Sequence, residues 1–124
     1  MRGLRGATTI EQNTKEEIWK AAQELMMRLL SRNRLKTEDI GAAIFSCTKD
    51  ITAAFPTAGL RQLPGFDLVP LFDAQEMDVE GSLPMCIRVL LLLNVDRNPA
   101  ELQHVYLRGA TMLRPDLGRR SKSF

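Results

Sequence analysis

The strongest hydrophobic pattern in the chain predicts one long amphipathic helix. Apolar side chains recur at steps of three and four residues from Ile18 to Leu30, and polar or charged side chains fall on the other side. Thr14 and Glu17 precede this stretch with the spacing of a capping box, in which the hydroxyl accepts a helix amide and the glutamate reaches back. We therefore expect a helix that begins at Thr14 and buries one face.

Shorter apolar stretches predict strands. The central one, Met85–Leu93, is almost continuously apolar, which is typical of a strand covered on both faces. The other expected strands are Arg2–Ile10, Ala42–Cys47, Leu68–Phe72 and His104–Leu107. Of these, Ala42–Cys47 is expected to pair beside the first strand.

Polar and turn-forming residues predict the connections. Short helical turns are expected at Thr37–Asp39, around Thr57–Gln62 and after Asn98, where a proline follows the capping side chain. Asp73–Pro84 is polar and contains glycine, so we expect a surface loop that carries Glu76.

This order of elements predicts an α+β fold, a mixed β-sheet with one long helix and short helices on one face. The other face of the sheet still needs cover, and a chain of 124 residues has few elements left to supply it. Several copies are therefore expected to pack their sheets together, most simply as a closed ring. This reasoning leaves dimer and trimer open.

Composition adds the limits of the domain and of its partners. With 44% hydrophobic and 26% charged residues, we expect one domain over residues 1–117 and a flexible tail over residues 118–124. A net charge of +2 gives no indication of a nucleic-acid partner. Because no signal peptide or membrane-spanning stretch is visible, we expect a cytoplasmic protein without a membrane partner. Cys47 and Cys86 lack metal-site spacing and are expected to be small buried residues.

One arginine interrupts the apolar central strand. Strand alternation places Arg88 on the same face as Cys86, Leu90 and Leu92. A guanidinium among apolar side chains is costly unless an anion or a carboxylate meets it. Arg88 therefore indicates a site for a negatively charged group on this face.

The remaining candidate residues favour an anionic ligand over nucleophilic or metal chemistry. The chain has a single histidine, His104, which is expected to make a structural hydrogen bond, and no motif of a metalloprotease, serine hydrolase, phosphate-binding loop or dinucleotide site. The notable group combines fixed cations with one carboxylate and one phenol: Arg5, Arg61, Arg88, Arg114, Glu76 and Tyr106. Such a group suits a multiply anionic substrate.

Six segments, in order along nearly the whole chain, resemble the signature stretches of the AroH-class chorismate mutases. They are Arg2–Thr9, Phe55–Pro56, Gln75–Val79, Cys86–Val89, His104–Leu107 and Leu113–Leu117. The resemblance implies a Bacillus chorismate mutase-like fold, a homotrimeric pseudo-α/β barrel with active sites at the subunit interfaces. It also implies an isomerase of aromatic amino acid biosynthesis that converts chorismate to prephenate without a cofactor or a metal.

The resemblance assigns catalytic roles to three residues. Arg88 resembles the arginine that contacts the ether oxygen of the breaking bond and a substrate carboxylate. Glu76 is similar to the glutamate that accepts a hydrogen bond from the ring hydroxyl. Arg5, together with Tyr106, matches the groups that hold the side-chain carboxylate.

It also implies further substrate-binding residues. Phe55 and Arg61 would come from the adjacent subunit, and Leu113 with Arg114 would close the site. Asp73 is expected to bind substrate as well, although it stands where a cysteine is familiar and brings a carboxylate near Glu76.

Other departures from the family pattern are Phe72 in place of a threonine and Thr57-Ala58 in place of an alanine-lysine pair.

Two other functions also stay open. A non-catalytic trimer could hold a carboxylate metabolite with the same arginines, and an imine deaminase of the RidA type has a similar architecture. The deaminase would not explain Glu76 together with Tyr106 and Leu113–Leu117.

Overall fold

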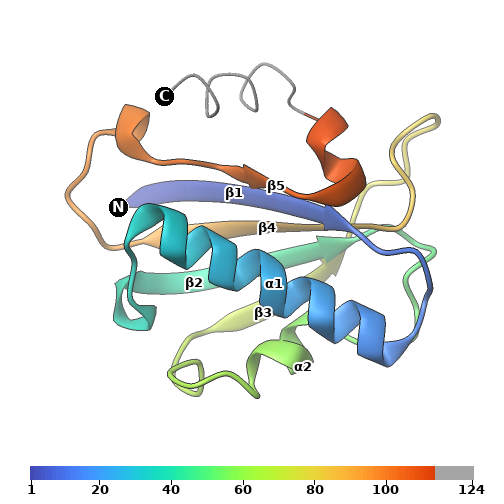
Figure 1. Cartoon of the computed structure of the whole chain (residues 1–124), viewed down its shortest axis with the longest axis horizontal. Helices are drawn as coiled ribbons and strands as arrows, with labels where there is room; N and C mark the ends of the chain where they lie inside the picture. The colour runs from blue at the N-terminus through green and yellow to red at the C-terminus, as the bar shows by residue number, and fades with distance from the viewer. Residues whose placement is uncertain (114–124) are drawn as a thin grey trace.

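One mixed β-sheet forms the centre of the molecule (Figure 1). The computed structural model describes residues 1–113. The strands are β1 (Arg2–Thr9), β2 (Ile40–Cys47), β3 (Leu71–Gln75), β4 (Cys86–Leu93) and β5 (Val105–Tyr106). They lie in the order β3-β2-β4-β1-β5, with β4 antiparallel to both of its neighbours and the pairs β1–β5 and β2–β3 parallel. This arrangement confirms the predicted α+β class.

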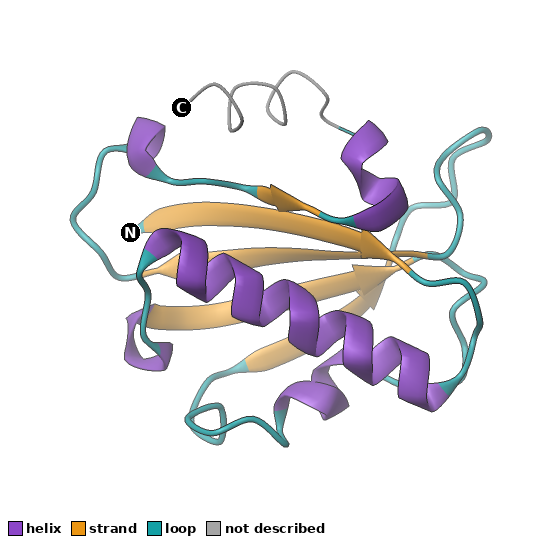
Figure 2. Cartoon of the chain, viewed as in Figure 1, coloured by secondary structure: helices purple, strands orange, loops and turns teal. Residues whose placement is uncertain are grey.

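The helices lie on one face of the sheet (Figure 2). There, α1 (Lys15–Asn33) crosses the strands, and the short α2 (Pro56–Leu60) packs against α1 and β3. Three 3₁₀ turns complete the described chain: η1 (Thr37–Asp39), η2 (Pro99–Glu101) and η3 (Arg108–Met112). The first two stand where the sequence predicts short turns. Among the helices of residues 1–113, none combines the length and the apolar character needed to span a lipid bilayer.

The long helix begins where the sequence predicts. Oγ1 of Thr14 accepts a hydrogen bond from the backbone N–H of Glu17 at 3.2 Å, which satisfies an amide that has no partner inside the helix. The second bond of the expected capping box, from the N–H of Thr14 to the side chain of Glu17, does not form. The N–H of Thr14 donates instead to the carbonyl oxygen of Gln12 at 2.9 Å. Glu17 turns instead toward Arg108, with 3.9 Å between Oε2 and Nη1.

Two strand predictions need correction. β2 does not lie beside β1, because β4 separates them and pairs with both. A strand that is apolar on both faces is best placed between two others. The third strand begins at Leu71, later than expected, after a turn in which the N–H of Val69 donates to the carbonyl oxygen of Phe66. Asp73–Gln75 therefore belongs to a strand paired with β2 and not to the expected surface loop.

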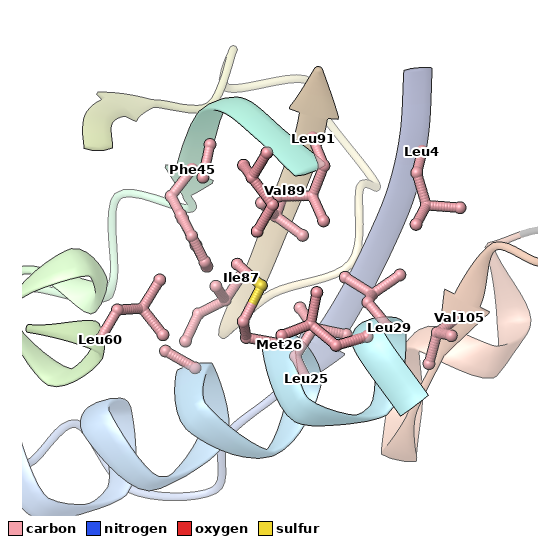
Figure 3. Packing of buried hydrophobic residues seen from close by; sticks show 14 of the residues in the cluster. Leu4, Leu25, Met26, Leu29, Phe45, Leu60, Ile87, Val89, Leu91 and Val105 are labelled. Carbon is pink, nitrogen blue, oxygen red and sulfur yellow. The ribbon is translucent and has the colours of Figure 1, made fainter. Parts of the chain in front are cut away.

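The core lies between the sheet and α1 (Figure 3). Leu4 on β1, Phe45 on β2 and Ile87 on β4 face Leu25 and Leu29 of α1, and all five are fully buried. Burial of each large apolar side chain contributes roughly 1.5–3 kcal/mol. This packing fixes the strands against the helix, and it therefore fixes which side chains the sheet presents on its other face.

That other face carries apolar side chains that residues 1–113 leave uncovered. Leu90, Ile44 and Phe72 are 37%, 36% and 62% exposed, and strand pairing places them side by side across β4, β2 and β3. The same face carries Arg88, which lies opposite Ala7 of β1. Contiguous exposed apolar surface marks an interaction site. The expectation that the second face needs a partner therefore has a structural basis.

A close approach at Gly59 holds α2 against α1. A Cβ at this position would lie 2.9 Å from Cβ and 3.0 Å from Cα of Trp19, so the backbone of α1 would have to move. Glycine-to-alanine changes inside helices usually stabilise by about 1 kcal/mol, whereas overpacking costs about 1–3 kcal/mol. We expect Gly59→Ala to lower the free energy of unfolding, measured by urea denaturation, by about 1–2 kcal/mol. An unchanged or raised stability would contradict this contact.

Candidate active site

A hollow of about 320 Å³ opens on the uncovered face of the sheet. Its charged and polar lining comes from Arg5 on β1, Ser46 on β2, Arg88 on β4 and Tyr106 on β5, and Leu113 contributes from the segment after η3. Four of the residues predicted from the sequence are therefore brought together. Two guanidinium groups in a largely apolar hollow suit a ligand with more than one negative charge.

Glu76 fixes the orientation of Arg88. Nε of Arg88 donates to Oε1 of Glu76 at 2.6 Å, and Nη2 donates to Oε2 at 3.5 Å, a two-point contact that sets the plane of the guanidinium. The side chain of Glu76 is 13% exposed and that of Arg88 is 39% exposed, so the arginine stays open toward the hollow. The N–H of Glu76 donates to the carbonyl oxygen of Cys47 at 2.8 Å, which anchors the residue just after β3. The expectation that a carboxylate meets Arg88 is confirmed.

Arg5 is held through its backbone. Its N–H donates to Nδ1 of His104 at 2.9 Å, next to the stretch in which β1 and β5 pair. The structural hydrogen bond expected of His104 is thus confirmed, and it fixes the part of β1 from which Arg5 extends. Tyr106 follows on β5 opposite Ala7, and this register brings its side chain to the hollow.

The segment that leads to Leu113 is docked on β1 and α1. Arg108 at its start has a left-handed backbone with φ of 52°, which is uncommon for a residue other than glycine. Its guanidinium donates to the carbonyl oxygen of Thr9 at 3.2 Å and lies 3.5 Å from Oε1 of Glu24. These contacts hold η3 in place. Arg114, which was predicted to close the site, and the expected tail lie outside the described residues.

Burial keeps both thiols protonated near neutral pH. It raises the pKa of Cys86 to about 11 and that of Cys47 to about 12, where the negative charge of Asp73 adds to the effect. A thiolate nucleophile is therefore scarce at either position. Within residues 1–113, no group of three or more His, Cys, Asp or Glu side chains is arranged to hold a metal ion.

Comparison with known proteins gives the chain a family. The family model "Chorismate mutase type I" matches residues 1–117. The chain belongs to the type I chorismate mutases. It is 48% identical over 118 residues to "Chorismate mutase AroH" of Thermus thermophilus. The aligned stretch covers 94% of this chain and 96% of that relative. It is 42% identical over 117 residues to "Chorismate mutase AroH" of Bacillus subtilis strain 168. Here the aligned stretch covers 94% of this chain and 92% of the relative.

A solved structure agrees with the family assignment. The chorismate mutase from Clostridium thermocellum superposes with a TM-score of 0.88 at 40% sequence identity, covering 90% of this chain and 99% of that one. The sheet and helices described above are therefore shared with an experimentally determined member of the chorismate mutases.

Three residues expected at a chorismate mutase site lie elsewhere on this chain. Phe55 and Asp73 line a second hollow, of about 520 Å³, between β3 and the start of α2. Arg61 follows α2 and donates through Nη1 to the carbonyl oxygen of Phe66 at 2.6 Å. None of the three lines the hollow of Arg88 in its own chain.

Sequence reasoning missed two residues that support the hollow of Arg88. Arg108 anchors η3, and the sequence gives no signal for its left-handed backbone or for its contact with Glu24. Gly109 is the second, because its N–H donates to Oγ1 of Thr9 at 3.0 Å and a Cβ would lie 2.9 Å from that oxygen. A glycine next to a conformationally demanding turn is the available signal.

Proposed function

We propose that this protein is an isomerase that converts chorismate to prephenate, an intramolecular Claisen rearrangement in phenylalanine and tyrosine biosynthesis. The observation that carries this function is the hollow in which Arg5, Arg88 and Tyr106 converge, in a chain that belongs to the type I chorismate mutases. The names of both sequence relatives support the same activity.

The reaction depends on positioning and electrostatics. A carbon–oxygen bond breaks while a carbon–carbon bond forms within one molecule, so no proton transfer or covalent intermediate is required. A site that holds the enolpyruvyl side chain over the ring removes an entropic barrier. Fixed positive charge beside the ether oxygen stabilises the negative charge that develops there. Arginine suits both tasks, because it stays protonated and bridges two oxygens at once.

The contacts of the described residues support a division of labour. Arg88 contacts the ether oxygen and one carboxylate, and its two-point bond to Glu76 holds the guanidinium in place before substrate arrives. Glu76 also accepts a hydrogen bond from the ring hydroxyl. Arg5 and Tyr106 bind the side-chain carboxylate from the neighbouring strands β1 and β5.

The active unit is a trimer in which each site draws on two chains. The apolar face of the sheet supplies the interface, because its exposed side chains surround the hollow of Arg88. Phe55, which lines the second hollow of its own chain, and Arg61, which follows α2, reach the Arg88 hollow of the adjacent subunit. Leu113 closes the same site.

Mixing two impaired variants tests the shared sites. Arg88→Ala damages one half of a site, and Arg61→Ala damages the half supplied by the neighbour. In trimers refolded from an equal mixture, about one quarter of the sites would have both arginines. We expect prephenate formation by the mixture to approach about a quarter of the wild-type rate, well above the mean of the two parents. A mixture that only matches this mean would contradict shared sites, and variants mixed without refolding are the control.

Incubation of the purified protein with chorismate tests the function itself. Loss of chorismate and equal gain of prephenate are expected. Chorismate that raises the melting temperature but is not consumed would instead indicate a carboxylate-binding protein.

A further inference from the structure

Asp73 directs both carboxylate oxygens to a single residue of α2. Oδ1 accepts a hydrogen bond from the backbone N–H of Thr57 at 3.4 Å, and Oδ2 accepts one from the Thr57 hydroxyl. Asp73 is paired with Phe45, so it lies on the face of the sheet that the helices cover. Glu76 contacts Arg88, which lies on the opposite face. The two carboxylates therefore serve different sides of the sheet.

The beginning of α2 has no cap within its own sequence. The residue before the helix is Phe55, whose side chain cannot accept a hydrogen bond, and the first helical residue is Pro56, which has no N–H. The first amide that needs an acceptor is therefore that of Thr57, and Asp73 meets it. A carboxylate at this end also interacts favourably with the aligned peptide dipoles. Strand β3 thus provides the cap that α2 lacks.

The two residues proposed to reach the adjacent subunit lie at the two ends of α2. Phe55 directly precedes the helix and is 70% exposed, and Arg61 directly follows it. In Figure 1, α2 lies next to β3 and α1. On the side of α1 it is fixed by the close approach at Gly59, and on the side of β3 by the bonds between Asp73 and Thr57. A change in either contact would move Phe55 and Arg61 together.

We infer that Asp73 is a positioning residue, which sets the place of Phe55 and Arg61 through Thr57, and that it does not contact substrate. This inference rests on the proposed function. A free carboxylate in the site would repel the dianion, whereas a carboxylate that accepts two hydrogen bonds from its own chain is held in place toward α2. The aspartate and the threonine, both departures from the family pattern, act as one unit.

Paired substitutions test this coupling. Asp73→Ala removes both hydrogen bonds and is expected to raise KM for chorismate about fivefold, which corresponds to the loss of one helix cap, with a smaller change in kcat. Thr57→Ala removes only the hydroxyl bond and keeps the capped backbone N–H, so its effect on KM should be smaller. The double variant should be no worse than Asp73→Ala, because loss of the carboxylate already breaks both hydrogen bonds to Thr57. Thr57→Ser keeps the hydroxyl and should stay within about twofold of wild type. Asp96→Ala removes an exposed carboxylate elsewhere and is the matched control for charge.

Direct contact with substrate would give a different result. The effects of Asp73→Ala and Thr57→Ala on KM would then multiply in the double variant, and the inference would be overturned. Hydrogen exchange followed by mass spectrometry supplies a readout that does not depend on turnover. Residues 55–61 should exchange faster in Asp73→Ala and in Thr57→Ala but not in Asp96→Ala, and unchanged exchange would overturn the inference. If the wild-type protein does not consume chorismate, the proposed function fails, and the exchange experiment still decides whether Asp73 positions α2.

Discussion

Replacing Arg88 by alanine is expected to lower kcat for chorismate by at least about a hundredfold, the scale of one lost oxyanion donor. The change removes the cation that lies between the hollow and Glu76. It also leaves the Glu76 carboxylate, whose side chain is 13% exposed, without its partner and beside a dianionic substrate. Because positive charge at the ether oxygen matters most as the bond breaks, the loss should appear in kcat more than in KM.

Arg88→Lys separates charge from geometry. An ammonium keeps the positive charge but cannot form the two-point bond to Glu76 and also bridge substrate oxygens, so turnover should still fall by at least about tenfold. Arg28→Ala, which removes an exposed arginine from α1, is the matched control and should retain wild-type kinetics. Near-normal kcat for Arg88→Ala in a direct chorismate-consumption assay would rule out the proposed role.

Local sequence patterns predicted the elements that short-range interactions determine. The apolar spacing of α1 and its cap at Thr14 are satisfied within one helix, so its start agrees with the prediction. Strand order depends on contacts between distant residues, and nothing in the sequence near Ala42 shows that β4 will separate β2 from β1. β3 was misplaced for the same reason. Asp73 disfavours a strand locally, but pairing with Phe45 of β2 extends the strand past it.

The candidate site shows the same limit. Arg5, Arg88 and Tyr106 could be predicted to share a site, because they lie in segments that resemble the family, and three neighbouring strands bring them to one hollow. The bond between Asp73 and Thr57 could not be predicted, because it requires the final positions of both β3 and α2. Sequence reasoning thus names charged residues more readily than the contacts that position them.

A carboxylate introduced on the uncovered face is expected to dissociate the trimer. Leu92 lies on this face between Gly3 and Ala42, is partly exposed, and does not line the hollow of Arg88. Leu92→Asp would bury a charge in the proposed interface, at a cost of several kcal/mol for each chain. We expect light scattering to report single chains, circular dichroism to show a retained sheet, and kcat/KM to drop by at least about a hundredfold, because each site loses the contacts from its neighbour.

Met27→Asp is the matched control for this change. Met27 lies on α1 and is 52% exposed, so the same substitution on the opposite side of the sheet should leave both assembly and turnover intact. Single chains with full activity in Leu92→Asp would show that one subunit is sufficient for catalysis. An unchanged trimer would show that another surface holds the subunits together. The proposed interface requires assembly and activity to be lost together, because the apolar surface that joins the chains also surrounds the hollow of Arg88.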